Sequence, residues 1–183
     1  MTELIAGLSG IMVGFVVLIV LFVIVIYNKL VRLRDTAQGL WSEIDIWLKK
    51  RYELVPNLVM TVKAYAAHEG SLFEKFSEAG YSAAMASSHA ERAQAEKTFN
   101  ETLKDISALA EAYPELKVDA NFSRLQSQLA DLENNVGQAS DYYNATVRDL
   151  NNLIETFPSN VIASSFKIKR EKLFETETGE ADK

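Results

Sequence analysis

Apolar residues form one unbroken block near the start of the chain. No residue from Leu4 through Asn28 is charged, and the stretch from Leu8 to Ile26 consists almost entirely of Leu, Ile, Val, Phe, Met and Gly. As a helix rising about 1.5 Å per residue, this block spans the roughly 30 Å hydrocarbon core of a bilayer. Apolar residues would cover every face of the helix, whereas a helix in a soluble core has one apolar stripe. Residues 1–28 are therefore predicted to form a transmembrane anchor.

A cleaved signal peptide is the alternative interpretation of this block. A signal peptide carries Lys or Arg before a shorter apolar region and ends in an A-x-A cleavage site. Here no Lys or Arg precedes the apolar residues, the apolar run is longer, and no such site follows it. The pattern favours an anchor that is retained.

The charges beside the anchor predict its orientation. Only Glu3 precedes it, whereas Lys29, Arg32 and Arg34 follow it directly. By the positive-inside rule, the chain is predicted to cross the cell (inner) membrane once, with its N-terminus outside and its remaining part in the cytoplasm. A domain on the outer side is the alternative, because a chain with one anchor offers only one pair of flanking segments whose charges can be compared. The three basic side chains are expected to contact anionic headgroups.

After the anchor, apolar residues recur at spacings of three and four, the period of a helix with one buried face. This pattern predicts a helix that continues from the bilayer to about Ala67. Pro56 interrupts it, but the phase is the same on both sides, so a kink is expected there. The stripe consists of Leu33, Ala37, Leu40, Trp41, Ile44, Leu48, Val55, Leu58 and Val62.

Two capping boxes mark helix starts in the next segment. Ser71 with Glu74 and Ser88 with Glu91 each place a carboxylate three residues after a serine. They predict two helices, or one helix with an irregular middle, ending near Tyr113.

The clearest apolar stripe runs from Phe122 to Ile154 and ends at Phe157-Pro158. A short amphipathic piece and an acidic tail, residues 175–183, follow it. Helices with one apolar stripe each can bury those stripes only against one another. The predicted fold is all-α, an N-terminal transmembrane helix continuing into an antiparallel bundle of three to four long helices over residues 29–174.

Three segments together resemble the LemA family. They are YNKLVRLR with WSEIDIWLKKRYELVPNLVMTVKAYAAHE (27–34 and 41–69), YPELKVDANFSRLQSQLADLE (113–133) and YYNATVRDLNNLIETFPSNVIASSF (142–166). The resemblance implies an N-terminal membrane helix with a helical bundle, and it implies no established activity. The sequence departs from the family pattern at Trp47, where a polar residue is expected, at Ser140, where Arg is expected, and at Phe166-Lys167-Ile168, where Phe-Gly-Phe is usual.

Composition and motifs point away from several classes of function. The chain has no cysteine, which excludes disulfides and thiolate sites, and its net charge of -6 argues against nucleic acid as a ligand. Neither His68 nor His89 has the companion residues of a metal-binding motif, and no nucleophile motif or phosphate loop occurs. We therefore expect no enzyme activity, no catalytic residue, no cofactor, no metal and no small-molecule substrate.

Several residues of the first predicted helix stand out chemically. Arg51 lies in register with the buried stripe, where it needs a carboxylate partner such as Asp45, Glu53 or Glu133. Its predicted setting is a partly exposed ion pair within the bundle.

A candidate interaction surface comprises Trp47, Lys49, Lys50 and Phe166. Trp47 is expected to cover the rim of the core or to anchor another chain. Lys49 and Lys50 would lie roughly 30 Å beyond the anchor, too far to reach the bilayer. The basic, aromatic stretch that begins at Phe166 is expected either to lie on a membrane or to pack over the bundle end.

These features predict a non-enzymatic, membrane-anchored scaffold that self-associates. Gly10 and Gly14 form a small-xxx-small pair that would let transmembrane helices approach closely. The expected partners are the bilayer, further copies of the chain and another membrane protein. A membrane-tethered adaptor or sensor is the alternative function, and an unrecognised hydrolase is the third.

Overall fold

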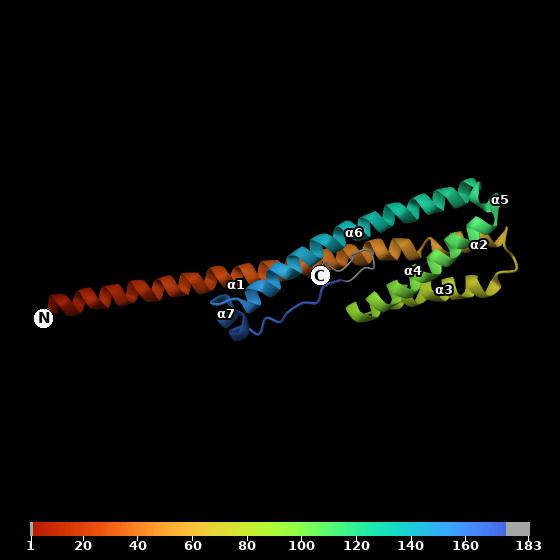
Figure 1. The fold of residues 1–183 in the computed structure, drawn as a ribbon. Coiled ribbons are helices and arrows are strands. Elements are labelled where there is room, and N and C mark those ends of the chain that lie inside the picture. Colours follow the sequence, from red (N-terminus) through yellow and green to blue (C-terminus); the bar gives the residue numbers. More distant parts are fainter. Residues whose placement is uncertain (1, 175–183) are drawn as a thin grey trace. The chain divides into compact units, whose positions relative to one another are not determined.

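The structure, a computed structural model, describes residues 2–174, and over these residues it contains helices and no strands. The helices are α1 (Thr2–Tyr52), α2 (Val55–Lys63), α3 (Gly70–Met85), α4 (His89–Ala112), α5 (Pro114–Lys117), α6 (Ala120–Glu155) and α7 (Ser159–Ser165) (Figure 1). The predicted all-α class is confirmed. The acidic tail predicted for residues 175–183 lies outside the described residues.

α1 contains the apolar block. Every residue from Gly10 to Phe22 is exposed, although most of them are large and apolar. Among the described residues, this is the one helix that is long and apolar enough to cross a membrane. Its exposure shows that residues 10–22 do not form part of a core in the folded chain.

The boundary between α1 and α2 is sharper than the predicted kink. α1 ends at Tyr52, and α2 begins at Val55 after a two-residue turn. Pro56 explains this position, because it has no N–H to donate to the carbonyl four residues earlier, that of Tyr52, and its ring crowds that carbonyl. The expectation of one helix to about Ala67 was therefore wrong, since α2 also ends at Lys63. The buried stripe nevertheless continues through Val55, Leu58 and Val62.

The chain divides into two compact units, which are described separately. Unit 1 comprises residues 1–39 and 144–173, and unit 2 comprises residues 40–143 and 174–183. In unit 1, α7 and the C-terminal part of α6 pack on α1. The buried core of this unit is Leu30, Leu150, Ile162 and Ala163.

Unit 2 holds α2 to α5 with the adjoining parts of α1 and α6. α3 and α4 pack along each other, joined by only three residues. Aromatic side chains fill the interior: Phe76 stacks on Phe99 with ring centroids 5.4 Å apart, and Tyr52 meets Phe99 edge-on at 5.3 Å. The apolar stripes predicted for the first and last long helices supply much of the rest, including Ile44 and Phe122.

The two predicted capping boxes have different outcomes. At α4 the backbone N–H of Glu91 donates to the Ser88 hydroxyl at 3.2 Å, and the N–H of Ser88 donates to the Glu91 carboxylate at 3.3 Å. This box is confirmed, and it separates α3 from α4. The box at Ser71 was wrong, because α3 already begins at Gly70 and no side chain caps it. The carbonyl of Glu69 accepts the first helical bonds, which places Ser71 inside the first turn.

Candidate functional site

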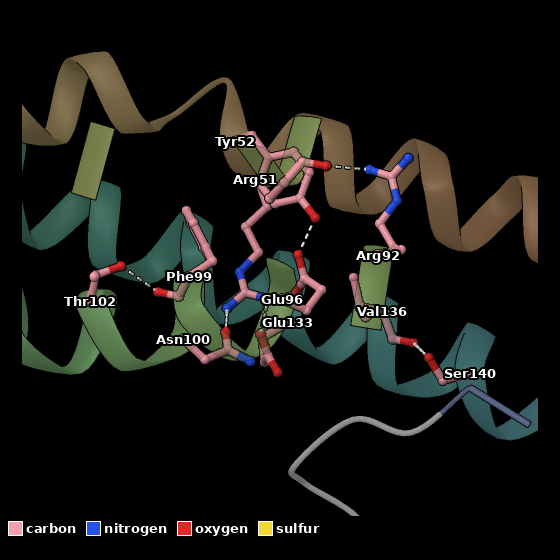
Figure 2. A network of polar contacts seen from close by, with 11 residues as sticks. Arg51, Tyr52, Arg92, Glu96, Phe99, Asn100, Thr102, Glu133, Val136 and Ser140 are labelled. Atoms are coloured by element: carbon pink, nitrogen blue, oxygen red, sulfur yellow. Dashed lines mark hydrogen bonds and ion pairs between the residues drawn. The ribbon is translucent and has the colours of Figure 1, made fainter. Parts of the chain in front are cut away.

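A buried polar network is the most developed chemical feature of unit 2, and it centres on Arg51 (Figure 2). The Nη1 atom of Arg51 lies 3.0 Å from Oε2 of Glu96 on α4 and 2.9 Å from Oε2 of Glu133 on α6. Its Nη2 atom donates to the side-chain oxygen of Asn100. The guanidinium also lies over the ring of Phe99, 4.8 Å from its centroid. Three helices thus meet on one cation.

Burial governs the protonation of this network. Arg51 is 2% exposed and Glu96 is 4% exposed. Burial raises the pKa of the Glu96 carboxyl, while the charge of Arg51 and a hydrogen bond from the Tyr52 hydroxyl oppose that shift. Burial and the neighbouring Glu96 carboxylate both raise the pKa of Tyr52, which keeps the phenol protonated as a donor.

A second arginine ties α4 to the end of α3. Arg92 is buried, and it donates to the carbonyls of Ala83 at 2.7 Å and Ala86 at 2.8 Å. These are carbonyls at the C-terminal end of α3, where a helix leaves acceptors without partners and favours positive charge. Arg92 also pairs with Asp45 at 2.6 Å, and Asp45 in turn pairs with Lys49 at 2.7 Å.

The network is chemically balanced. Three cations, Arg51, Arg92 and Lys49, face three carboxylates, those of Asp45, Glu96 and Glu133. A buried ion pair links the helices that supply it, although it adds little net stability. The Nε atom of Arg51 is buried without a hydrogen-bond partner, so the bonds run through its two terminal nitrogens. The arrangement therefore positions α1, α4 and α6 in unit 2.

The sequence predicted part of this network. The ion pair between Arg51 and Glu133 is confirmed, but Arg51 is buried and not partly exposed. Glu96 and Asn100 were not predicted as partners of Arg51. A signal for Glu96 existed, because Arg92, Glu96 and Phe99 follow one another at helical spacing and share one buried face of α4.

Two apolar grooves flank Tyr81 in unit 2. One, of about 930 Å³, lies between α3 and α4 and is lined by Tyr81, Met85 and Thr98 among others. The other, of about 710 Å³, lies between α2 and α3 and is lined by Tyr81 and Met60. Met60, Tyr81 and Met85 are each more than 60% exposed. Sequence reasoning did not single out these residues, because an exposed apolar position between two stripes has no periodic signal.

The residues predicted to contact headgroups or to pack between anchors all lie on the surface of α1. Lys29, Arg32 and Arg34 are exposed in unit 1. An added Cβ at Gly10 or Gly14 would meet no atom within 4 Å. Both glycines are therefore open to an approaching helix.

The predicted interaction surface falls in both units. Trp47, Lys49 and Lys50 lie in unit 2, where the Nζ atom of Lys50 stands over the half-buried Trp47 ring at 4.2 Å. Phe166 lies in unit 1, with its ring centroid 4.5 Å from that of Tyr27. Trp47 therefore has its contact with Lys50 inside unit 2, and Phe166 has its contact with Tyr27 inside unit 1.

No group of three or more His, Asp or Glu side chains that could hold a metal ion lies among the described residues. These residues define an all-helical protein with one exposed, apolar N-terminal helix and an internal ion-pair network in its bundle. The LemA family model matches residues 40–183, and the chain belongs to the LemA family. A search of curated proteins found no match.

Proposed function

We propose that this LemA-family protein is a non-enzymatic scaffold that is anchored in the cell (inner) membrane and self-associates there. The observation that carries the proposal is the exposed apolar surface of α1 between Gly10 and Phe22. A contiguous apolar surface of this extent is unfavourable in water and marks contact with lipid or protein. Lys29, Arg32 and Arg34 support a cytoplasmic bundle and an outer N-terminus, because they follow the apolar surface directly.

The polar chemistry of the bundle supports a structural role. Arg51 and Glu96 are buried and bind each other. Arg51 also lines a cleft of about 600 Å³ with Asn100 and Glu133, but Glu96 is not part of that lining, so the two buried partners do not face the cleft as a pair of catalytic groups would. Their bonds connect helices, which is what a scaffold requires.

Self-association is supported by two surfaces that the folded chain leaves open. In the anchor, Gly10 and Gly14 lie four residues apart on one face of α1. In unit 2, Met60, Tyr81 and Met85 are exposed beyond the buried stripes. Small residues permit close packing between membrane helices, and exposed Met and aromatic side chains are enriched where proteins meet.

Mass measurement of the full-length protein in detergent, before and after Gly14→Leu, tests the proposal. Leu at residue 14 has room in a single chain, so it should lower the oligomer mass without unfolding the bundle. Val16→Phe is the matched control, because residue 16 lies on the far side of the helix from the two glycines. A protein that is monomeric from the start would contradict self-association, and oligomers that survive both Gly14→Leu and Tyr81→Ala would contradict the two surfaces assigned to it. Release of the protein from membranes by alkaline carbonate would contradict the anchor.

The groove between α3 and α4 supports a second candidate function, that of a membrane-tethered adaptor. Its apolar lining suits an amphipathic helix of another protein, which would place its apolar face against Tyr81 and Met85. Photocrosslinking from residue 85 in membranes separates the two functions. A scaffold gives crosslinks between copies of this chain, whereas an adaptor gives a crosslink to one different protein.

A further inference from the structure

The C-terminal part of unit 1 packs against the end of the apolar block. Ile162 and Ala163 of α7 are buried in a core to which Val23 and Ile26 of α1 also belong. Beside them, the ring of Phe166 meets that of Tyr27. Val23 precedes Lys29, the first charged residue after the apolar block, by six positions, or about 9 Å along the helix axis. α7 therefore lies at the level where the apolar block meets the first charges.

Large apolar side chains are exposed at this level. Phe157, Val161 and Phe166 are 77%, 55% and 51% exposed, on the turn before α7, on α7 and directly after it. The hydroxyls of α7 that lie near them are already bonded, whereas the side-chain oxygen of Asn160 is buried without a hydrogen-bond partner. The hydroxyls of Ser164 and Ser165 both donate to the carbonyl of Val161, at 2.9 and 2.8 Å. Internal bonding of this kind lowers the cost of removing hydroxyls from water.

Basic residues border the apolar side chains. Lys167, Lys169 and Arg170 follow Phe166 directly and are exposed. Unit 1 as a whole contains eight Lys and Arg against five Asp and Glu, although the net charge of the whole chain is -6. The cationic excess is thus concentrated in the unit that contains the apolar block.

The basic segment is held in place by α6. The side-chain amide of Asn151 donates to the carbonyl of Glu171 at 2.9 Å, and its oxygen accepts from the N–H of Glu171 at 3.1 Å. Arg170 also pairs with Glu155. These contacts keep the segment beside α7 and the apolar block.

We propose that α7 with the flanking residues 157–170 is a second membrane-contacting element, which inserts Phe157, Val161 and Phe166 into the interface beside the anchor and places Lys167 and Lys169 on anionic headgroups. The proposal rests on the anchor proposed above. Interfacial elements bury apolar side chains about 5–10 Å into the boundary between headgroups and acyl chains and add basic residues that attract anionic lipid. α7 is at the right level, and residues 157–170 present both kinds of side chain.

The absence of cysteine permits a direct test with spin labels on single introduced cysteines in the full-length protein. The variants are Phe157→Cys and Val161→Cys, with Val20→Cys in the apolar block and Val118→Cys in unit 2 as the two references. The protein is placed in nanodiscs of phosphatidylcholine with or without phosphatidylglycerol. The measurement is the accessibility of each label to oxygen, which concentrates in lipid, and to a water-soluble nickel complex.

We expect the oxygen-to-nickel ratio at residues 157 and 161 to exceed that at residue 118 several-fold and to approach that at residue 20. The ratio at residue 161 should be higher with phosphatidylglycerol, and Lys169→Gln should reduce this difference. Aqueous labels at residues 157 and 161 with a lipid-exposed label at residue 20 would overturn the inference and leave the anchor standing. A label at residue 161 that neither reagent reaches would also overturn it, because protein would then cover this surface. An aqueous label at residue 20 would refute the anchor itself.

Discussion

Replacing Arg51 by Met should destabilise unit 2 strongly. Met keeps much of the side-chain length. It removes the positive charge and the N–H donors that bind Glu96, Glu133 and Asn100. Glu133 is about one-third exposed and can turn to water, whereas Glu96 is 4% exposed and cannot. Removal of one partner from a buried ion pair costs about 3–5 kcal/mol, chiefly because the other charge is left unpaired. The burial of Glu96 places Arg51→Met in this range.

Thermal unfolding of the full-length protein in detergent, followed by circular dichroism, measures the effect. For a chain of this size, about 2–4 °C of Tm corresponds to 1 kcal/mol, so a fall of roughly 6–20 °C is expected. Arg124→Met is the control, because Arg124 is exposed on α6 and makes only a long contact, 3.4 Å, to Asn121. Exposed substitutions of this kind usually change stability by less than about 0.5 kcal/mol.

Two further measurements show whether the cost arises from Glu96. Arg51→Met combined with Glu96→Leu should be less destabilised than the sum of the single variants, because no unpaired carboxylate then remains in the core. The deficit of Arg51→Met should also be larger near neutral pH than in mild acid. Loss of Arg51 raises the folded-state pKa of Glu96 further, and stability linked to a raised pKa is present at low pH and is lost as the pH rises through that value. A Tm of Arg51→Met equal to that of Arg124→Met would refute this reasoning.

Three more predictions concern local geometry, each measured by thermal unfolding. Ser88→Ala should cost about 1 kcal/mol by removing the cap of α4, whereas Ser71→Ala, which removes no cap, should leave Tm nearly unchanged; equal effects would be inconsistent with the caps observed. Lys167→Gly should stabilise unit 1 by roughly 1 kcal/mol, because Lys167 has a φ of 55°, and Lys169→Gly, at a position without positive φ, should not. Hydrogen bonds from the backbone N–H and the hydroxyl of Ser87 lower the pKa of Glu91 below 4.5. The stability that ionised Glu91 contributes is therefore present above that pH and is lost as the pH falls through the folded-state pKa. Glu91→Gln should therefore flatten the fall of Tm with acid, and a parallel fall in both proteins would exclude this cause.

The positive φ of Lys167 connects the family pattern with the structure. The resemblance led us to expect glycine between Phe166 and residue 168, and the backbone there adopts the left-handed conformation that favours glycine. Lysine at this position adopts the left-handed conformation at a cost in backbone strain, and it adds a cation next to the exposed Phe166. The departure from the family pattern thus fits the membrane contact proposed for this segment.

Helix ends were predicted less well than helix faces. The stripe from Leu33 to Val62 was identified from its spacing alone, since burial repeats with the turn of the helix. The end of α1 at Tyr52 was not identified, because the same phase on both sides of Pro56 is compatible with a kink and with a break. The start of α3 at Gly70 was missed because the Ser71 and Glu74 pair has the sequence of a capping box. The preceding turn, which lets the carbonyl of Glu69 accept the first helical bonds, decided that start.

The sequence by itself determined the all-α class, the exposed apolar helix and the position of Arg51 on the buried stripe, because each depends on the period or length of a local pattern. Only the tertiary structure decided which of the candidate carboxylates pairs with Arg51, its partners on α4, the Arg92 cap on α3 and the packing of α7 beside Val23 and Ile26. These contacts join residues far apart in the chain. Their geometry depends on how whole helices pack, and no local spacing records it.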